Sequence, residues 1–301
     1  MSTSPAQSAS VSQTEADAAA AARAVPADAG YLLGSDPVEI RRLLAQAELL
    51  AQEAEWLLDE LALGEGAAVV DVGCGPLGLL AALAARVGPH GRVVGVDSNP
   101  VMVRAAQERC QALGLGQVAV LGGDARGTGL APGAFDLAHV RLVLVNVADP
   151  AGVIGELVRL VKPGGVVAVQ ELDWLSWCCE PPHPAWDSLR GRLHELWRSR
   201  GFDPYIGRRL PGLLRAAGLV DVRAMAHTGL DGADQPYQRL ILDFARRFTA
   251  PMVELGLASA AELAELIAEL EAHLSRPGAL AMRAMTVQAW GRAPGAARPR
   301  N

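Results

Sequence analysis

The segment from Val69 to Gly78 constrains the fold of this chain more than any other part of the sequence. It reads Val-Val-Asp-Val-Gly-Cys-Gly-Pro-Leu-Gly and leads into an apolar run at 79–83. An apolar run that ends near an acid, followed by glycines and then by apolar residues at helical spacing, is typical of a strand, a tight turn and a helix. Glycines let the backbone approach a ligand closely, and the helix N-terminus offers free N–H groups there. We therefore predict the first β-α unit of a nucleotide-binding sheet, with Asp71 at its ligand-binding edge.

Strands and helices are predicted to alternate from Ala67 onward. The predicted strands cover residues 67–72, 92–97, 117–121, 134–141, 166–172, 219–227 and 280–290. The predicted helices cover residues 36–63, 78–87, 99–113, 149–161, 185–199, 207–217, 235–249 and 259–274. Strands joined by such helices pair in parallel through right-handed crossovers, which indicates an α/β fold. The last strand is expected to pair antiparallel.

The glycine turn is compatible with more than one kind of protein. Gly73-x-Gly75-x-x-Gly78 matches the dinucleotide fingerprint, and Asp97 follows at about the interval expected for a ribose-binding acid. This match alone would indicate an NAD(P)-dependent oxidoreductase. Asp71 argues against it, because a carboxylate attracts a cationic ammonium group but repels a pyrophosphate. Asp97 can accept hydrogen bonds from both ribose hydroxyls, and it can also cap the helix that follows.

Five motifs, in this order along the chain, resemble those of class I S-adenosylmethionine-dependent methyltransferases. They are Val-Val-Asp-Val-Gly-Cys-Gly (69–75), Val-Val-Gly-Val-Asp (93–97), Gly-Gly-Asp-Ala (122–125), Phe-Asp (135–136) and Val-Lys-Pro-Gly-Gly (161–165). The resemblance spans roughly residues 31–228 and points to the small-molecule, natural-product branch. It implies a Rossmann-like fold with a mostly parallel seven-stranded sheet, an antiparallel last strand and added helices that cap the active site. Leu77 departs from the pattern, since many members have Gly or Thr there.

The resemblance also implies S-adenosylmethionine as the cofactor and a set of residues that contact it. Asp124 resembles the acid that accepts from the adenine amino group, and Tyr31 resembles an aromatic residue that lies over the methionine part. Asn146 stands where many members have His, and an amide cannot act as a general base. The predicted cofactor contacts are Tyr31, Asp71, Gly73, Cys74, Gly75, Asp97, Ser98, Met102, Gly123, Asp124, Ala125, Arg141 and Asn146. Arg42 and Gln46 are further candidates for the cofactor carboxylate.

Acids and aromatic residues follow the predicted strand 166–172, at the ligand edge of the sheet. Trp174 and Trp177 either form the walls of a pocket for a flat or apolar acceptor or belong to the core beneath a loop. Because methyl transfer releases one proton, we nominate His183 first as its acceptor, and then Glu171 or Asp173. We interpret His139, inside a predicted strand, as a packed structural histidine.

Composition excludes several other classes. The net charge of −6 argues against a nucleic-acid partner, and no apolar run is long enough to span a membrane. The four cysteines and six histidines show no disulfide framework and no metal-ligand spacing, so we expect no metal. We expect a cytoplasmic bacterial enzyme that acts on a small-molecule acceptor, with a homodimer as one option.

The chain is predicted to divide into five segments. They are a disordered segment (1–29), an N-terminal helical cap (30–64), the cofactor-binding core (65–230), a helical cap insertion (231–278) and the last strand with the tail (279–301). The hypothesis is a methyltransferase that moves a methyl group to an O, N or C atom of an acceptor in specialised metabolism, by direct displacement. The alternatives are an NAD(P)-dependent oxidoreductase and a noncatalytic S-adenosylmethionine-binding protein.

Overall fold

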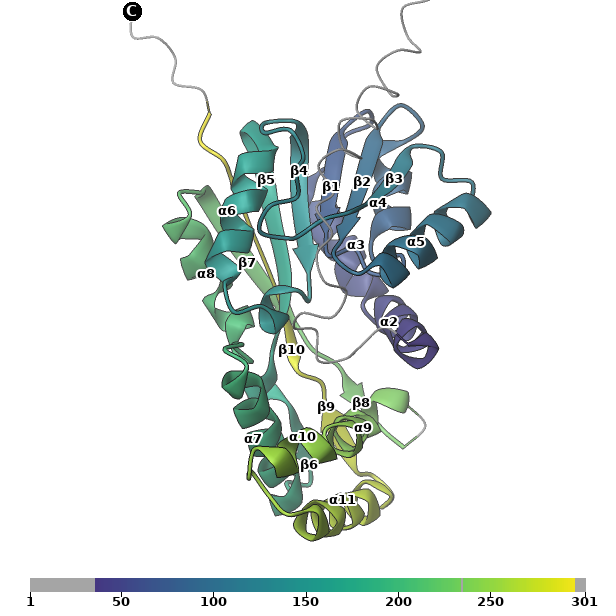
Figure 1. Cartoon of the computed structure of the whole chain (residues 1–301), viewed down its shortest axis with the longest axis vertical. Coiled ribbons are helices and arrows are strands. Elements are labelled where there is room, and N and C mark those ends of the chain that lie inside the picture. Colours follow the sequence, from purple (N-terminus) through teal and green to yellow (C-terminus); the bar gives the residue numbers. More distant parts are fainter. Residues whose placement is uncertain (1–35, 234, 296–301) are drawn as a thin grey trace, which may run out of the picture.

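The computed structural model describes residues 36–233 and 235–295, which are built around a seven-stranded sheet (Figure 1). The strand order is β3-β2-β1-β4-β5-β10-β7. The bounds are β1 Ala68–Val72, β2 Arg92–Asp97, β3 Val118–Gly122, β4 Phe135–Arg141, β5 Val161–Asp173, β7 Val220–His227 and β10 Met285–Arg292. Strands β1 to β5 pair in parallel, whereas β10 lies between β5 and β7 and is antiparallel to both. The predicted Rossmann-like sheet with an antiparallel last strand is confirmed.

Helices cover both faces of the sheet because successive strand residues point to opposite sides. Val69 and Val93 pack with α3 Ala51–Leu61 and α4 Leu80–Val87, while Val70 and Val94 pack in the core that contains α6 Pro150–Leu160 and α8 Ile206–Ala216. Helix α5 Pro100–Ala112 is capped by Asn99, whose side chain accepts from the Val101 N–H. The cap predicted for Asp97 is therefore supplied by Asn99, which leaves Asp97 at the sheet edge.

A second layer of short elements lies beyond the carboxyl edge of the sheet, in the lower half of Figure 1. It contains α2 Pro37–Leu49, α7 Pro184–Ser199, α9 Leu240–Arg247, α10 Thr249–Glu254, α11 Ala260–Leu274 and three 3₁₀ turns, η1 Leu144–Asn146, η2 Trp174–Ser176 and η3 Pro236–Arg239. Strands β6 Cys178–Glu180, β9 Leu280–Met282 and β8 Leu230–Asp231 form a small sheet in the order β6-β9-β8. None of the helices in the described part of the chain is long and apolar enough to cross a membrane.

The structure differs from the predicted elements in three places. The predicted helix 36–63 is broken at Leu50, the predicted helix 235–249 is divided into η3, α9 and α10, and the predicted strand 280–290 becomes β9 and β10. Residues 162–165 of the fifth motif form a bulge inside β5, because Phe135 pairs with Val161 and Leu137 with Val166. The small sheet was not predicted, since its strands are two or three residues long and pair across distant parts of the chain.

Candidate active site

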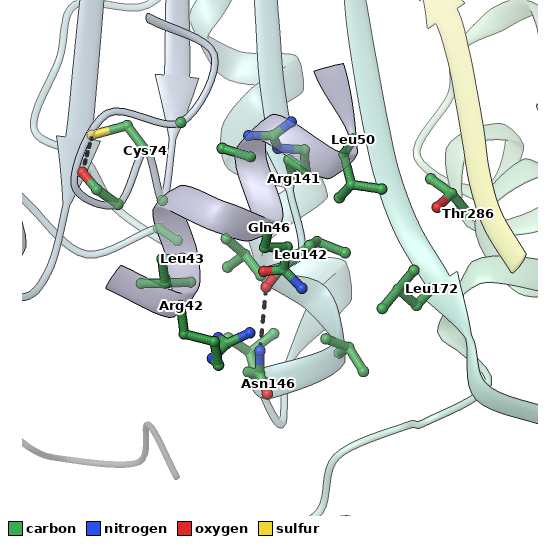
Figure 2. Close-up of a pocket in the computed structure, with 18 of the residues that line it drawn as sticks. Arg42, Leu43, Gln46, Leu50, Cys74, Arg141, Leu142, Asn146, Leu172 and Thr286 are labelled. Carbon is green, nitrogen blue, oxygen red and sulfur yellow. Dashed lines mark hydrogen bonds between the residues drawn. The ribbon is translucent and has the colours of Figure 1, made fainter. Parts of the chain in front are cut away.

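A cavity of about 610 Å³ lies between the carboxyl edge of the main sheet and the short elements beyond it. One part is lined by the glycine turn after β1, the ends of β2 and β3, and the loop after β4 (Figure 2). The other part is lined by side chains from α2, η2, α7, α9 and the start of β10. The cavity therefore joins the carboxyl edge of the sheet, where α/β folds bind nucleotides, to a chamber lined mainly by the added elements.

The glycine turn is shaped by contact with the loop that follows β4. Gly73 and Gly75 have φ angles of 72° and 59°, which favour glycine. A Cβ atom added to Gly73 would lie 2.2 Å from Cγ2 of Val143, so any side chain there would displace this loop. The turn thus holds two segments of cavity wall against each other.

Asp97 lies at the end of β2 and is fixed by two backbone donors. Its Oδ2 accepts from the Gly75 N–H at 2.9 Å, and its Oδ1 accepts from the Asn99 N–H at 2.9 Å. Burial raises the pKa of this carboxyl group, and the two hydrogen bonds oppose that effect. Each carboxylate oxygen has a further lone pair, so Asp97 can also accept from two hydroxyl groups of a ligand.

Asp71 and Arg141 place opposite charges on the neighbouring wall of the cavity. Asp71 is 2% exposed, and its Oδ1 lies 2.7 Å from Nδ1 of His139. The Arg141 side chain makes no hydrogen bond or ion pair within the described part of the chain, and desolvation lowers its pKa although Asp71 and Glu53 oppose this. This pair of charges complements a ligand that carries both an ammonium and a carboxylate group.

The loop after β4 is held in an unusual conformation. Leu142 has a φ of 57°, and the Asn146 amide donates to the Leu142 carbonyl oxygen at 3.2 Å, as Figure 2 shows. The indole N–H of Trp197 donates to Asn146 Oδ1 at 3.3 Å. Both ends of the Asn146 amide are therefore engaged where the two parts of the cavity meet.

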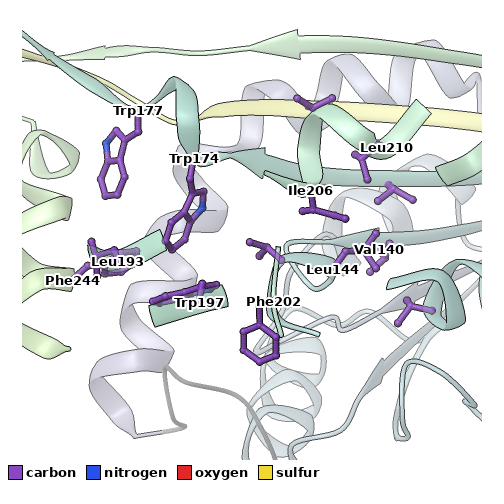
Figure 3. Packing of buried hydrophobic residues seen from close by; sticks show 14 of the residues in the cluster. Val140, Leu144, Trp174, Trp177, Leu193, Trp197, Phe202, Ile206, Leu210 and Phe244 are labelled. Atoms are coloured by element: carbon purple, nitrogen blue, oxygen red, sulfur yellow. The ribbon is translucent and has the colours of Figure 1, made fainter. Parts of the chain in front are cut away.

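Aromatic side chains gather in the second part of the cavity (Figure 3). The ring centroids of Trp174 and Trp197 are 4.8 Å apart, and that of Phe244 lies 6.0 Å from Trp174. Trp177 is 6.2 Å from Trp174, at a T-shaped angle. All four residues line the cavity and belong to the hydrophobic core. A contact of Trp174 and Trp177 with an acceptor stays a prediction.

Comparison with known proteins assigns the sheet and its cavity to a family. The family model described as a methyltransferase domain matches residues 63–196. This part of the chain is a class I S-adenosylmethionine-dependent methyltransferase domain. The enzymes of this family take S-adenosylmethionine as their cofactor.

Individual relatives agree with this assignment. An uncharacterised 37.1 kDa protein in transposon TN4556 of Streptomyces fradiae is 35% identical over 61% of this chain, and the chain spans only 52% of that protein. A demethylmenaquinone methyltransferase of Geobacillus stearothermophilus is 28% identical over 54% of this chain and 75% of its own length. The crystal structure of a putative methyltransferase from Bacillus halodurans has the same fold, with a TM-score of 0.52 and 17% identity over 79% of this chain and 97% of that one.

The residues of the methyltransferase domain fit its cofactor. Asp97 offers acceptors for the ribose hydroxyls, and Asp71 and Arg141 offer charges for the ammonium and carboxylate groups of the methionine part. Asp124 lines the same part of the cavity, where Arg126 pairs with its carboxylate at 2.7 Å and holds its pKa below the usual range. An adenine contact there would involve the free lone pairs of this carboxylate or the backbone beside it.

The structure brings nearly all of the predicted binding residues to one cavity. The following predicted residues line it: Asp71, Gly73, Cys74, Gly75, Asp97, Ser98, Met102, Gly123, Asp124, Ala125, Arg141, Asn146, Trp174 and Trp177. Arg42 and Gln46 of α2 line it as well. Tyr31 lies outside the described residues. The binding roles of these residues remain predictions.

None of the three residues nominated as proton acceptors lines the cavity, which corrects the expected location. His183 caps α7 by accepting from the Ala185 N–H at 3.2 Å, and its ring lies against His273. Asp173 is 1% exposed and pairs with Arg208 at 2.6 Å. Glu171 is fully buried and accepts from the Leu144 N–H beneath η1. Leu172 of β5 and Trp174, the first residue of η2, line the cavity, whereas Glu171 and Asp173 on either side of Leu172 do not, because neighbouring strand residues point to opposite faces.

Several cavity residues were not predicted from the sequence. They are Glu53, Trp197, Arg200, Phe202, Tyr237, Phe244 and Arg283. They come from α3, from α7 and the segment after it, from η3 and α9, and from the segment between β9 and β10. Their positions depend on how distant elements pack, and the only local signal was the apolar spacing in α7 and α9.

Proposed function

We propose that this protein transfers the methyl group of S-adenosylmethionine to a flat, largely apolar small molecule that binds in the aromatic part of the cavity. The observation that supports this most is the continuity of a single cavity. It carries the predicted cofactor contacts at one end and Trp174, Trp177, Trp197 and Phe244 at the other. Indole and phenyl faces bind flat or apolar molecules well and exclude water from the reacting atoms.

The protein contributes mainly alignment and exclusion of water. When bound, S-adenosylmethionine supplies a methyl group on a positively charged sulfur that departs as a neutral thioether. Asp71, Asp97 and Arg141 would hold the cofactor, and the loop 142–146 would separate it from the acceptor chamber. Holding two reactants in the correct geometry accounts for a large part of the rate enhancement in such a displacement.

The acceptor is expected to have an acidic nucleophile, such as a phenol or an enol. The three candidates for a general base lie off the cavity, so a nucleophile that loses its proton readily suits the chamber better than an alcohol. An amine suits it less well, because Arg200 lines the chamber and repels cations, whereas Arg283 is already paired with Asp231. One relative is named as acting on demethylmenaquinone, and a compound of that kind belongs in the acceptor panel. The methylated atom and a role in bacterial specialised metabolism are parts of this proposal.

Calorimetric titration tests the cofactor part of the proposal. The unchanged protein is expected to bind S-adenosylmethionine and S-adenosylhomocysteine and not NADH. Asp97→Ala should raise the Kd of S-adenosylmethionine and of S-adenosylhomocysteine by at least about tenfold, because each lost hydrogen bond to a charged group is worth about 1.5–3 kcal/mol. Asp59→Ala is the matched control, since Asp59 is an exposed acid on α3 that does not line the cavity.

Release of S-adenosylhomocysteine in the presence of candidate acceptors, measured by mass spectrometry, tests the catalytic part. Phenolic and enolic acceptors should give product, and product should require both substrates. Binding of NADH alone would replace the proposal with the oxidoreductase alternative. Tight cofactor binding without turnover of any compound in a broad panel would favour the noncatalytic binding protein.

A further inference from the structure

His139 is a fully buried histidine whose imidazole makes its one hydrogen bond within the described residues to Asp71, on the cavity wall. It lies in the middle of β4 and is the register partner of Asp71 on β1. This pairing places its imidazole beside the carboxylate, with 2.7 Å between Nδ1 and Asp71 Oδ1. The pair therefore links the interior of the sheet to the carboxylate at its ligand edge.

The surroundings of the ring indicate where its proton lies. Nε2 of His139 is buried and has no hydrogen-bond partner among the described residues. A proton on Nε2 would therefore be a buried donor without an acceptor, which is costly. A proton on Nδ1 instead donates to the carboxylate and leaves only an unused lone pair at Nε2. The geometry thus favours His139 as a donor to Asp71.

The two oxygens of Asp71 face different surroundings. Oδ1 is engaged by His139, whereas Oδ2 is directed toward the glycine turn, 3.3 Å from where a Cβ of Gly78 would be. No other hydrogen bond to this carboxylate is made within the described residues. Since an Asp side chain can rotate, His139 is the contact that selects the rotamer with Oδ2 toward the turn.

We propose that His139 is a positioning residue, which holds the Asp71 carboxylate in the orientation that binds the ammonium group of S-adenosylmethionine. This inference rests on the proposed function. His139 does not reach the cavity itself, so it acts only through Asp71. Its loss should affect ligands that carry the amino acid part of the cofactor and spare ligands that lack it.

Two probes separate this role from a general effect on folding. S-adenosylhomocysteine contains the ammonium group, and 5′-methylthioadenosine contains the same nucleoside without the amino acid. His139→Leu should raise the Kd of the first by about five- to tenfold, as expected for one lost hydrogen bond to a charged group, and change that of the second less than twofold. His139→Asn places an amide donor near the former Nδ1 and should restore most of the affinity for S-adenosylhomocysteine.

A double-mutant cycle tests whether His139 acts through Asp71. In an Asp71→Ala background, His139→Leu should cause no further loss of affinity for S-adenosylhomocysteine. If His139→Leu does not fold, ¹⁵N-histidine spectra of the unchanged protein give the same information. The His139 Nδ1 resonance should shift with S-adenosylhomocysteine and stay in place with 5′-methylthioadenosine.

Three outcomes would overturn this inference while the proposed function stands. His139→Leu could weaken the binding of both probes equally, or both probes could shift the His139 resonance equally. His139→Leu could also still lower the affinity for S-adenosylhomocysteine in the Asp71→Ala background. Failure of the unchanged protein to bind S-adenosylhomocysteine would overturn both. Selective loss with S-adenosylhomocysteine, together with rescue by His139→Asn, would establish the positioning role.

Discussion

A hydrogen bond between Trp197 and Asn146 lies where the two parts of the cavity meet. Trp197→Phe keeps an aromatic ring but removes the donor to Asn146 Oδ1. Since a neutral hydrogen bond contributes about 0.5–1.5 kcal/mol, and this one is long, kcat should fall about two- to fivefold. The Kd for S-adenosylmethionine should change little, because the cofactor contacts lie elsewhere. Steady-state kinetics and calorimetry measure the two quantities.

Trp186→Phe is the matched control for this prediction. It also removes one indole donor, which bonds to the Trp177 carbonyl oxygen at 3.1 Å, but Trp186 does not line the cavity. Both variants should lose similar stability in thermal unfolding. Equal effects of the two on kcat would show that Trp197 acts through packing alone, and not through Asn146.

At the level of single residues, the sequence was informative where the site follows directly from a strand end. Asp71 is the last residue but one of β1 and Asp97 ends the neighbouring parallel strand β2, and Gly73 and Gly75 sit in the short turn after β1. It was less informative after β5, where the residue pattern alone suggested that Glu171 and Asp173 faced the ligand. The alternation of side chains along a strand could have corrected this, because Leu172, between the two acids, points to the other face and lines the cavity.

Helical turn η1 rests on a buried acid of β5, which predicts a pH-dependent stability. Burial raises the pKa of Glu171 from 4.5 to about 8, although hydrogen bonds from Leu144 and its neighbours oppose the shift. Between these values the folded protein holds a proton that the unfolded chain releases, so the free energy of unfolding falls as pH rises. Glu171→Gln still accepts from the Leu144 N–H and does not titrate. The free energy of unfolding of Glu171→Gln, relative to that of the unchanged protein, should increase by about 1–3 kcal/mol from pH 5 to pH 8.

Denaturant unfolding at several pH values measures this difference. Glu180→Gln is the control, since Glu180 is exposed on β6 and its replacement should leave the pH dependence as it is. A constant difference between Glu171→Gln and the unchanged protein across this range would contradict the prediction, because it would mean that Glu171 titrates alike in both states.

Long elements were predicted well because each carries its own periodic pattern, whereas the short ones were not. Strand β2 has the predicted bounds, and α11 lies within the predicted helix 259–274 and begins after Ser259, which accepts from the Glu262 N–H. Strands β6, β8 and β9 carry no such pattern and form only because α7 to α11 bring them together. The acceptor chamber is built mostly from these regions, so its walls could not be derived locally.

Over the whole molecule, the cavity is enclosed by segments from opposite ends of the chain. Glu39 of α2 is fully buried, and it pairs with Arg42 on its own helix at 2.6 Å and with Arg247 of α9 at 3.4 Å. Arg42 and other residues of α2 line the cavity, and so do Leu240 and Phe244 of α9. The pair between Glu39 and Arg247 thus connects two walls that are 208 positions apart in the sequence.

Weakening the pair between Glu39 and Arg247 should let α2 and α9 move apart more easily, without changing the side chains that line the cavity. Arg247→Gln removes a cation from the buried Glu39 carboxylate, and a loss of about 1 kcal/mol would lower kcat/KM about fivefold. Hydrogen exchange should become faster in α2 and α9, while β1 and β4 keep their protection. Arg246→Gln is the matched control, because Arg246 pairs with Asp243 and with Glu271 of α11, on a side away from the cavity. If both variants exchange and turn over alike, the pair with Glu39 does not hold the two walls together and they close independently.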